Sequence, residues 1–457
     1  MAPVSTLSSS APTVNDAPRN VELKVHNHIY AVSTAPPPES LSLTQLARTV
    51  PATLVSKRAA KDDELWPRKL WDSKVSAAIA RRGLEKQDCA ELRYGNPQDH
   101  PIPGIVEVFT NATLPPPGRE VDWYAYSVPA REDLEAVAGR LSNSRGVIYH
   151  PEDIIVTDGS LTALDLLVYV STDPGDEVMI LSPVYFNYPV IIRHREAVPV
   201  IVPARTDNFE PNIEEIRRAI TPRTKAIIIN SPNNPTGVIY SASCLIELSK
   251  MLQQVNVTRA SPILVISDEA YSRIVYDKAH FTSITTLYPY SAMTYTTGKT
   301  LLAPGQRLGY IALSSLMPVS HRHVFRRSLT VAQNSTWGFP SSPLLHSLNK
   351  LDTMSIDLDR FQARRDFVCD SLSASGFRVL RPSGTFYVCV YIPRRRSFAS
   401  IAAVEEADER FCLSLAEQGV LVMPGALFGW PGTFRISLTA NEEQLNRAVK
   451  VLAELTQ

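Results

Sequence analysis

The sequence contains no apolar stretch that approaches the roughly 20 residues a membrane-spanning helix requires. It also lacks a net charge, because 46 basic residues are balanced by 46 acidic ones, so nothing draws the whole chain toward nucleic acid or an anionic membrane. Residues 1–19 are rich in Ser, Ala and Pro but have neither the basic start nor the apolar core of a signal peptide. We therefore expect a soluble protein with no nucleic-acid or membrane partner.

Cysteine is scarce and irregularly placed. The cysteines are odd in number, widely scattered and without a CxxC motif, which argues against a disulfide framework or a zinc site and favours a cytoplasmic location. Two histidine pairs, His26 with His28 and His321 with His323, have no acidic or cysteine partners at ligand spacing, so we interpret them as solvated and expect no metal. The five cysteines are Cys89, Cys244, Cys369, Cys389 and Cys412.

The N-terminal segment differs in composition from the rest. Residues 1–65 include three consecutive prolines at 36–38, few aromatic residues and no sustained period, which predicts a variable, partly disordered extension. The whole chain of 457 residues, with 44% hydrophobic content, can bury a large core but is too long for a single small domain. Two joined domains are therefore the expectation.

Short apolar runs alternate with amphipathic stretches between about residues 125 and 330. Runs this short and rich in β-branched residues are typical of strands buried between helix layers, which predicts an α/β domain around a mainly parallel sheet. Polar motifs follow these runs, and ligands of open α/β sheets bind beyond the carboxyl ends of the strands. The predicted strands are residues 154–156, 178–181, 226–229 and 263–266.

After about residue 330 the pattern changes to a long helical region with strand-like segments at 384–390 and 433–437. The last helix should begin at Asn441, with the Gln444 side chain returning the capping contact. Its apolar face should pack on a small C-terminal domain. That face comprises Leu445, Ala448, Val449, Leu452 and Leu455.

Lys299 is the most informative residue, because of the side chains around it. A lysine that forms an imine with an aldehyde cofactor needs a neighbouring phosphate site, and the Thr296 hydroxyl and the Arg307 guanidinium can supply one. Asp268 follows an apolar run and can accept a hydrogen bond from a protonated pyridine nitrogen, although a helix N-cap is the alternative interpretation. The segment 158–162, Asp-Gly-Ser-Leu-Thr, begins an amphipathic stretch and so places backbone N–H groups where phosphate binds.

These motifs, together with Ser-Pro-Asn-Asn-Pro-Thr-Gly at 231–237 and Ser-Asp-Glu-Ala-Tyr at 267–271, occur in the order and spacing of a known family. Over about residues 90–440 the chain resembles aminotransferases of class I/II in the aspartate aminotransferase superfamily, the fold-type I pyridoxal phosphate (PLP) enzymes. The resemblance implies an α/β fold of type I, with a large domain built on a mainly parallel seven-stranded sheet between helices and a smaller α+β domain. The implied boundaries are 66–125 and 331–457 for the two parts of the small domain and 126–330 for the PLP-binding domain.

The resemblance also implies roles for individual residues. Phosphate binding falls to Ser160, Leu161, Thr296 and Arg307, and the pyridine contact to Asp268. Tyr185 would stack on the pyridine ring, for which core packing is the alternative, and Asn234 and Tyr271 would bind the cofactor's phenolic oxygen. At the substrate end, the resemblance implies Gly95 at the site mouth, Asn234, and Arg435 as the clamp of the α-carboxylate. Trp337 and Phe339 are further candidates for the pocket by position alone.

A homodimer with shared active sites is implied too, because the family carries a tyrosine that reaches the phosphate of the neighbouring subunit. Tyr124 and Tyr126 precede the helix-like 131–141 at the matching place, and we favour Tyr124. The chain departs from the family at residues 127–130, where a glycine is usual, and at Gly298, where a serine commonly precedes the lysine. The loop at 127–130 is therefore expected to be reshaped.

The implied function is PLP-dependent transfer of an amino group between an amino acid and a 2-oxo acid, with Lys299 as the imine-forming residue and then the acid/base at Cα. The two departures keep a PLP-dependent lyase, decarboxylase or cyclase of the same fold open as an alternative. A non-catalytic PLP-sensing regulator is the alternative from another class, although residues 1–65 lack the basic face and helix-turn-helix pattern of a DNA-binding module. The sequence indicates neither the amino donor nor the acceptor.

Overall fold

The structure is a computed structural model that describes residues 21–25, 28–32, 67–393 and 400–455. The chain divides into two units, residues 1–63 and residues 64–457. In the first unit, β1 (Val21–Val25) and β2 (His28–Val32) pair in antiparallel register, a hairpin that the sequence did not predict. The remainder of the 1–65 extension, including His26, lies outside the described residues.

A seven-stranded sheet organises the second unit, with the strand order β4-β10-β9-β8-β7-β5-β6. β10 is antiparallel to both its neighbours, and the other pairs are parallel, so the predicted mainly parallel sheet is confirmed. All four predicted apolar runs fall within strands or within one residue of them. The strands are β4 (Ile154–Thr157), β5 (Glu177–Ser182), β6 (Val198–Pro203), β7 (Thr224–Asn230), β8 (Leu264–Asp268), β9 (Ser291–Thr296) and β10 (Gly309–Leu313).

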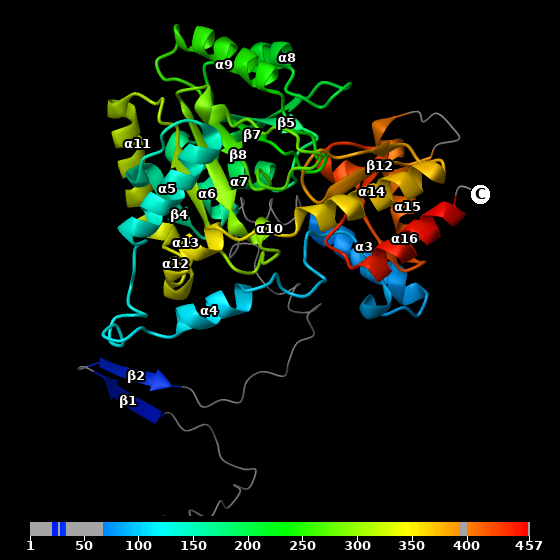
Figure 1. The fold of residues 1–457 in the computed structure, drawn as a ribbon, viewed down its shortest axis with the longest axis horizontal. Helices are drawn as coiled ribbons and strands as arrows, with labels where there is room; N and C mark the ends of the chain where they lie inside the picture. Colours follow the sequence, from blue (N-terminus) through cyan, green and yellow to red (C-terminus); the bar gives the residue numbers. More distant parts are fainter. Residues whose placement is uncertain (1–20, 26–27, 33–66, 394–399, 456–457) are drawn as a thin grey trace, which may run out of the picture. The chain divides into compact units, whose positions relative to one another are not determined.

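Helices cover both faces of this sheet, as Figure 1 shows. Successive side chains of a strand point to opposite faces, so Ile180 and Ile228 pack with α6 (Ser160–Ser171), α7 (Tyr188–His194) and α11 (Val319–Ala332). Their neighbours Met179 and Ile227 pack on the other face, in the core that includes α8 (Ile213–Ala219) and α9 (Ala242–Asn256). Burial on both faces explains why the strands read as continuous apolar runs rather than as alternating ones.

A further core on that second face lies over β4, β9 and β10. It includes residues of α4 (Ile105–Thr113), α5 (Arg131–Arg145), α12 (Ser342–His346) and α13 (Leu348–Asp352). The apolar residues of α11 to α13 thus pack on the large sheet, although they lie close to or beyond residue 330, where the sequence placed the domain boundary. The boundaries 66–125, 126–330 and 331–457 stay a prediction.

A four-stranded antiparallel sheet, β11-β12-β15-β14, forms the smaller α+β part. Its core includes the N-terminal helix α3 (Pro67–Arg81), where Trp71 Nε1 donates to the Val422 carbonyl at 3.2 Å. A short parallel pair, β3 (Ala90–Glu91) with β13 (Val420–Leu421), also joins the two ends of the chain. The other elements are β11 (Val379–Leu380), β12 (Tyr387–Tyr391), β14 (Met423–Pro424), β15 (Thr433–Ser437), α14 (Leu358–Ala374), α15 (Ile401–Ala416) and α16 (Glu442–Glu454).

The last helix agrees with its prediction in most respects. The Asn441 side chain caps α16 by accepting from the Gln444 N–H at 2.9 Å, and Leu445, Ala448 and Leu452 are buried. The expected return contact was wrong, because the Gln444 side chain instead accepts from the Glu91 N–H at 3.0 Å. Leu455 lies beyond the helix and is 41% exposed, so it does not extend the apolar face. No helix among the described residues is long and apolar enough to cross a membrane.

Candidate active site

A cavity opens at the carboxyl ends of the central strands, and it brings together all the site residues that the resemblance implies except Tyr124. The polar ends of β7, β8 and β9 meet there with β12 and β15 of the smaller sheet. The lining residues are Tyr94, Gly95, Asn96, Ser160, Leu161, Tyr185, Phe186, Tyr188, Asn230, Asn234, Asp268, Ala270, Tyr271, Thr296, Gly298, Lys299, Pro304, Arg307, Tyr387 and Arg435.

Lys299 stands on α10 (Thr297–Thr300), a single helical turn that follows directly from β9. The Thr296 hydroxyl caps this turn by accepting from the Gly298 N–H at 3.2 Å. The Lys299 ammonium nitrogen lies 5.7 Å from the ring centroid of Tyr271 and 5.8 Å from that of Phe386. A Cβ at Gly298 would lie 3.1 Å from Pro304 Cα, a tight contact that would require a small shift of the turn at 303–304.

The start of α6 and Arg307 form a cradle suited to an anion. Gly159, with φ +81°, brings the chain into α6, whose first N–H groups have no partner within the helix. Arg307 Nη2 lies 2.8 Å from where a Cβ on Gly159 would stand, so a side chain there would push the guanidinium away, and the positive φ of Gly159 also disfavours any residue with a Cβ. The Thr296 hydroxyl also lines the cradle, but it donates to the Leu308 carbonyl at 3.1 Å and would have to leave that acceptor to donate to a phosphate.

Asp268 ends β8 and is almost fully buried. Its carboxylate accepts from the Tyr188 hydroxyl at 2.6 Å and from the Ala270 N–H at 3.2 Å. Burial raises the pKa of Asp268, while these two bonds and the charge of Lys299 act against the rise. No helix begins after Asp268 in this part of the chain, so the N-cap interpretation does not apply.

Tyr188 is a site residue that the sequence did not single out. It lies three residues after Tyr185, and the two rings make an edge contact with centroids 5.4 Å apart. The Tyr185 hydroxyl accepts from Asn187 Nδ2 at 3.0 Å. The only sequence signal for Tyr188 is its place in the polar segment after β5, which it shares with Tyr185.

Arg435 lies on β15 and is 2% exposed. Its Nη1 donates to the Asn234 side-chain oxygen at 2.7 Å and its Nη2 to the Arg93 carbonyl at 2.6 Å. The Nε–H is buried without a hydrogen-bond partner, which is costly unless a ligand accepts from it. A planar cation with an unused donor is well suited to a carboxylate.

Tyr387 is a second residue that the sequence missed. The Arg435 guanidinium carbon lies 3.9 Å from its ring centroid. Burial alone would raise the pKa of Tyr387, but the charges of Arg435 and Lys299 and hydrogen bonds from Tyr271 and the Gly95 N–H lower it overall. Gly95 itself has no room for a side chain, because a Cβ would lie 2.5 Å from Phe386 Cε2.

Four residues singled out from the sequence, Tyr124, Tyr126, Trp337 and Phe339, lie elsewhere in this subunit. Tyr124 is 61% exposed, and its hydroxyl donates to the Thr113 carbonyl. Together with Tyr126 and Phe339 it lines a separate cavity. Trp337 donates to the Asp165 carboxylate at 2.7 Å and does not line the Lys299 cavity, so its assignment to the pocket by position was wrong.

The residues present fit pyridoxal phosphate. The glycine cradle beside Arg307 matches a phosphate, buried Asp268 matches a protonated ring nitrogen, and the orphan Nε of Arg435 matches a substrate carboxylate. A metal is not indicated by the described residues, since they contain no group of three His, Cys, Asp or Glu arranged to hold one.

Sequence comparisons identify relatives of known family. The family model for aminotransferase class I and II matches residues 120–452. A probable aspartate/prephenate aminotransferase from Thermus aquaticus is 34% identical over 390 residues, covering 84% of this chain and 96% of its own length. An aspartate aminotransferase from Geobacillus stearothermophilus is 32% identical over 326 residues, covering 69% of this chain and 79% of its own length.

Solved structures agree as well. The aspartate aminotransferase of Thermotoga maritima superposes with a TM-score of 0.72 at 26% identity, covering 88% of this chain and 99% of its own. A single mutant of the Thermus thermophilus aspartate aminotransferase gives a TM-score of 0.68 at 30% identity, with 84% and 96% coverage. With its fold of type I and a lysine, aspartate and arginine converging on one cavity, the chain belongs to the aminotransferase class I and II family and is a PLP-dependent aminotransferase.

Proposed function

We propose that this enzyme transaminates an α-amino acid that is held by its carboxylate on Arg435, with Lys299 as the residue that bonds to the cofactor and then carries the proton. The observation that supports this most strongly is the unpartnered Nε–H of Arg435, a residue that lines the same cavity as Lys299. A carboxylate bound there would complete the hydrogen bonding of the guanidinium.

Each group then has a definable task. Pyridoxal phosphate, when bound, would supply an electron sink for the pair left on Cα after proton removal. Asp268 would hold the proton on the ring nitrogen, Arg307 and the first turn of α6 would hold the phosphate, and Lys299 would move a proton between Cα and the cofactor carbon. Asn234 links the substrate and cofactor parts of the proposed site. Its side-chain oxygen accepts from Arg435 Nη1, and the residue is also a proposed contact of the cofactor.

We propose that Asn234 and Tyr271 bind the phenolic oxygen of the cofactor and that Tyr185 stacks on its ring. The support is positional, since all three line the Lys299 cavity. Ser160, Leu161 and Thr296 are proposed phosphate contacts on the same ground, and Gly95 is proposed at the substrate end, where its missing side chain leaves room beside Phe386 and Tyr387.

A homodimer that shares its active sites is also proposed. Several apolar and aromatic side chains between residues 106 and 128 are strongly exposed, among them Val121, Tyr124 and Tyr126. Such a cluster is typical of a surface covered by another protein. Tyr124 is the proposed contribution to the neighbouring phosphate site. A cytoplasmic location stays a prediction. The five cysteines, on which that prediction was based, are all free and buried.

The amino donor needs a screen. The curated relatives are named for aspartate and prephenate, so L-aspartate is the first donor to test. Among the described residues, however, the only cations that line the cavity are Lys299, Arg307 and Arg435, each with a proposed partner already. Neutral and aromatic amino acids therefore belong in the same screen, because they carry no second carboxylate that needs a cation.

The test measures the formation of 2-oxo acid, ammonia and carbon dioxide in parallel by purified enzyme. A lyase or decarboxylase reaction would therefore be detected as well. The parent protein should absorb visible light after incubation with PLP, and borohydride should fix the cofactor to Lys299. Lys299→Ala should lose the covalent link and the activity. Attachment to another lysine, or oxo-acid formation that survives in Lys299→Ala, would contradict the proposal.

A further inference from the structure

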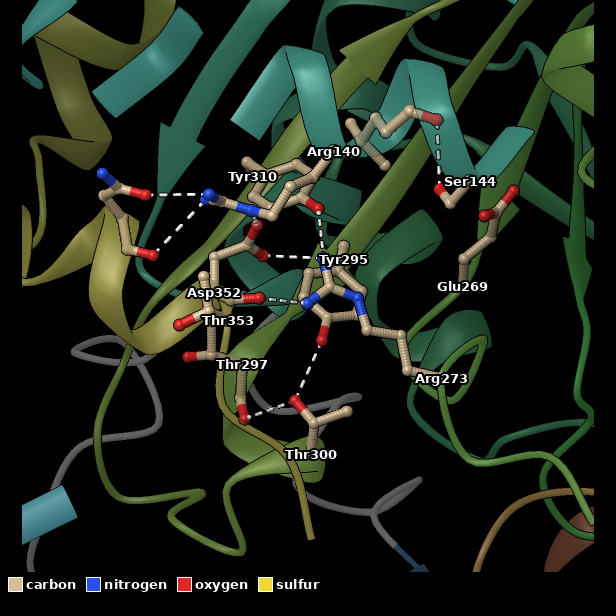
Figure 2. Close-up of polar contacts among 12 residues, drawn as sticks. Arg140, Ser144, Glu269, Arg273, Tyr295, Thr297, Thr300, Tyr310, Asp352 and Thr353 are labelled. Carbon is tan, nitrogen blue, oxygen red and sulfur yellow. Dashed lines mark hydrogen bonds and ion pairs between the residues drawn. The ribbon is translucent and has the colours of Figure 1, made fainter. Parts of the chain in front are cut away.

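Behind the Lys299 turn lies a buried charged cluster that does not line the cavity (Figure 2). Its centre is Asp352, the last residue of α13, whose side chain is 0% exposed. Two arginines bind this carboxylate: Arg140 Nε donates to Oδ2 at 2.7 Å and Arg273 Nη2 to Oδ1 at 2.7 Å. The two arginine side chains are 30% and 29% exposed, so the fully buried group is the carboxylate, and a buried carboxylate is costly unless cations hold it in a defined geometry.

Arg273 connects this cluster to the cofactor site along the sequence. It lies two residues after Tyr271 and five after Asp268, and its Nη1 also donates to the Asp352 carbonyl at 2.6 Å. Its guanidinium carbon is 4.4 Å from the ring centroid of Tyr295. Burial would lower the pKa of Arg273, but Tyr295, Tyr310 and Asp352 around it raise it overall, so the charge persists.

Tyr295 carries the connection on to the lysine. Its hydroxyl lies 2.9 Å from the Thr300 hydroxyl, in the turn that bears Lys299. Either hydroxyl can donate in this bond, and when Thr300 donates its proton to the Thr297 carbonyl at 3.2 Å, its oxygen accepts from Tyr295. Figure 2 marks the bonds between Asp352 and Arg273 and those from Tyr295 to Thr300 and from Thr300 to Thr297, while Arg273 and Tyr295 contact each other through the guanidinium and the ring.

The contacts close into a ring. The Ile356 N–H, four residues after Asp352, donates to the Thr300 carbonyl at 2.7 Å. One turn of helix is far below the length of about 12 residues at which an isolated helix becomes even marginally stable, so α10 depends on such outside contacts for its position. Because Lys299 lies within α10, the position of its side chain depends on the position of this turn.

We propose that Arg273 is a positioning residue for Lys299, acting through Tyr295 and Thr300 with Asp352 as its anchor. It joins the segment that carries Asp268 and Tyr271 to the turn that carries Lys299, and so fixes the lysine amine against the cofactor ring. The inference rests on the proposed function, in which Lys299 bonds to PLP.

The chain offers matched controls for the two informative changes. Tyr295→Phe removes only the hydroxyl in the ring of contacts, and Tyr288→Phe removes an equally buried hydroxyl, donated to the Ile263 carbonyl at 2.7 Å, in the core with α9. Arg273→Lys is compared with Arg140→Lys, because Arg140 binds the same carboxylate but is not among the groups that contact Tyr295 or α10.

The readout is the midpoint pH of the visible absorption of PLP bound to each variant, measured beside thermal stability and kcat with the best donor from the screen. A loss of folded protein lowers the amplitude but leaves the midpoint unchanged, whereas a displaced lysine alters it. We expect Tyr295→Phe and Arg273→Lys to shift the midpoint by about half a unit or more. We also expect them to lower kcat by about three- to tenfold with little change in KM.

Tyr288→Phe and Arg140→Lys should lose stability alone. If Tyr295→Phe keeps both the midpoint and kcat of the parent, or if the controls shift the midpoint as much, the proposal is overturned. Tyr295→Phe and Thr300→Val keep the test decisive should Arg273→Lys fail to fold. A parent protein without Lys299-dependent absorption would instead refute the proposed function, so the two failures are distinguishable.

Discussion

Arg435→Lys is the change that tests the substrate end of the site most directly. The substitution keeps a positive charge on β15 but removes the planar fork. In the structure this fork makes two hydrogen bonds to the protein, to Asn234 at 2.7 Å and to the Arg93 carbonyl at 2.6 Å, and leaves the Nε–H for a ligand. A single ammonium cannot satisfy the two protein acceptors and bind a carboxylate in the same plane.

The magnitude follows from these contacts. Losing a charge-assisted bond to the carboxylate together with the two bonds that fix the guanidinium in a buried site costs on the order of 2–4 kcal/mol of transition-state stabilisation, or about 30- to 1000-fold in kcat/KM. Cofactor retention should weaken too, because Asn234, a proposed contact of the cofactor, loses the group that fixes its side chain.

The assay is steady-state kinetics with the best donor, together with titration of the apoenzyme by PLP. Arg364→Lys is the matched control, since Arg364 is also buried and also donates to a carbonyl, that of Leu438 at 3.3 Å, but does not line the cavity. The control should lose stability and keep kcat/KM. If Arg435→Lys turns over an α-amino acid within a few-fold of the parent, the carboxylate binds elsewhere and the reasoning is refuted.

Three other predictions concern Tyr188, Gly95 and the dimer. Tyr188→Phe removes a hydrogen bond that lowers the pKa of Asp268, so this pKa should rise and the acid limb of the kcat profile should move to higher pH, while Tyr288→Phe leaves it in place. An unchanged limb would mean that Tyr188 does not set the ionisation of Asp268. Gly95→Ala forces a Cβ to within 2.5 Å of Phe386, which should cost about 1–3 kcal/mol in a denaturant unfolding experiment and raise KM. Gly139→Ala in α5, where nothing lies within 4 Å of the new Cβ, should not destabilise the protein. Light scattering should give a dimer, and replacing both Tyr124 and Tyr126 by Ser should weaken PLP retention, whereas a fully active monomer would contradict the shared site.

The sequence by itself determined the architecture around the large sheet and the set of residues that meet in the cavity. Strands buried on both faces must be continuous apolar runs, and the carboxyl ends of parallel strands share one edge, so Asp268 and Asn234 were predictable as neighbours from their places after such runs. The cap at Asn441 was predictable because it depends on residues three apart. Local patterns carry this information because the contacts behind them are local or repeat along the sheet.

Only the tertiary structure decided the contacts between segments far apart in the chain. The Gln444 side chain accepts from the Glu91 N–H, 353 residues away, instead of contacting its own helix cap, because that backbone donor needs an acceptor. Tyr188 donates a hydrogen bond to Asp268, 80 residues away in the sequence, and Arg273 donates one to Asp352, 79 residues away. Any tyrosine or arginine looks the same in sequence whether it packs in a core or fixes a carboxylate, since its partner is chosen by the folding of the whole chain. The sequence therefore identified the groups that bear the chemistry, and the fold selected the side chains that hold them in place.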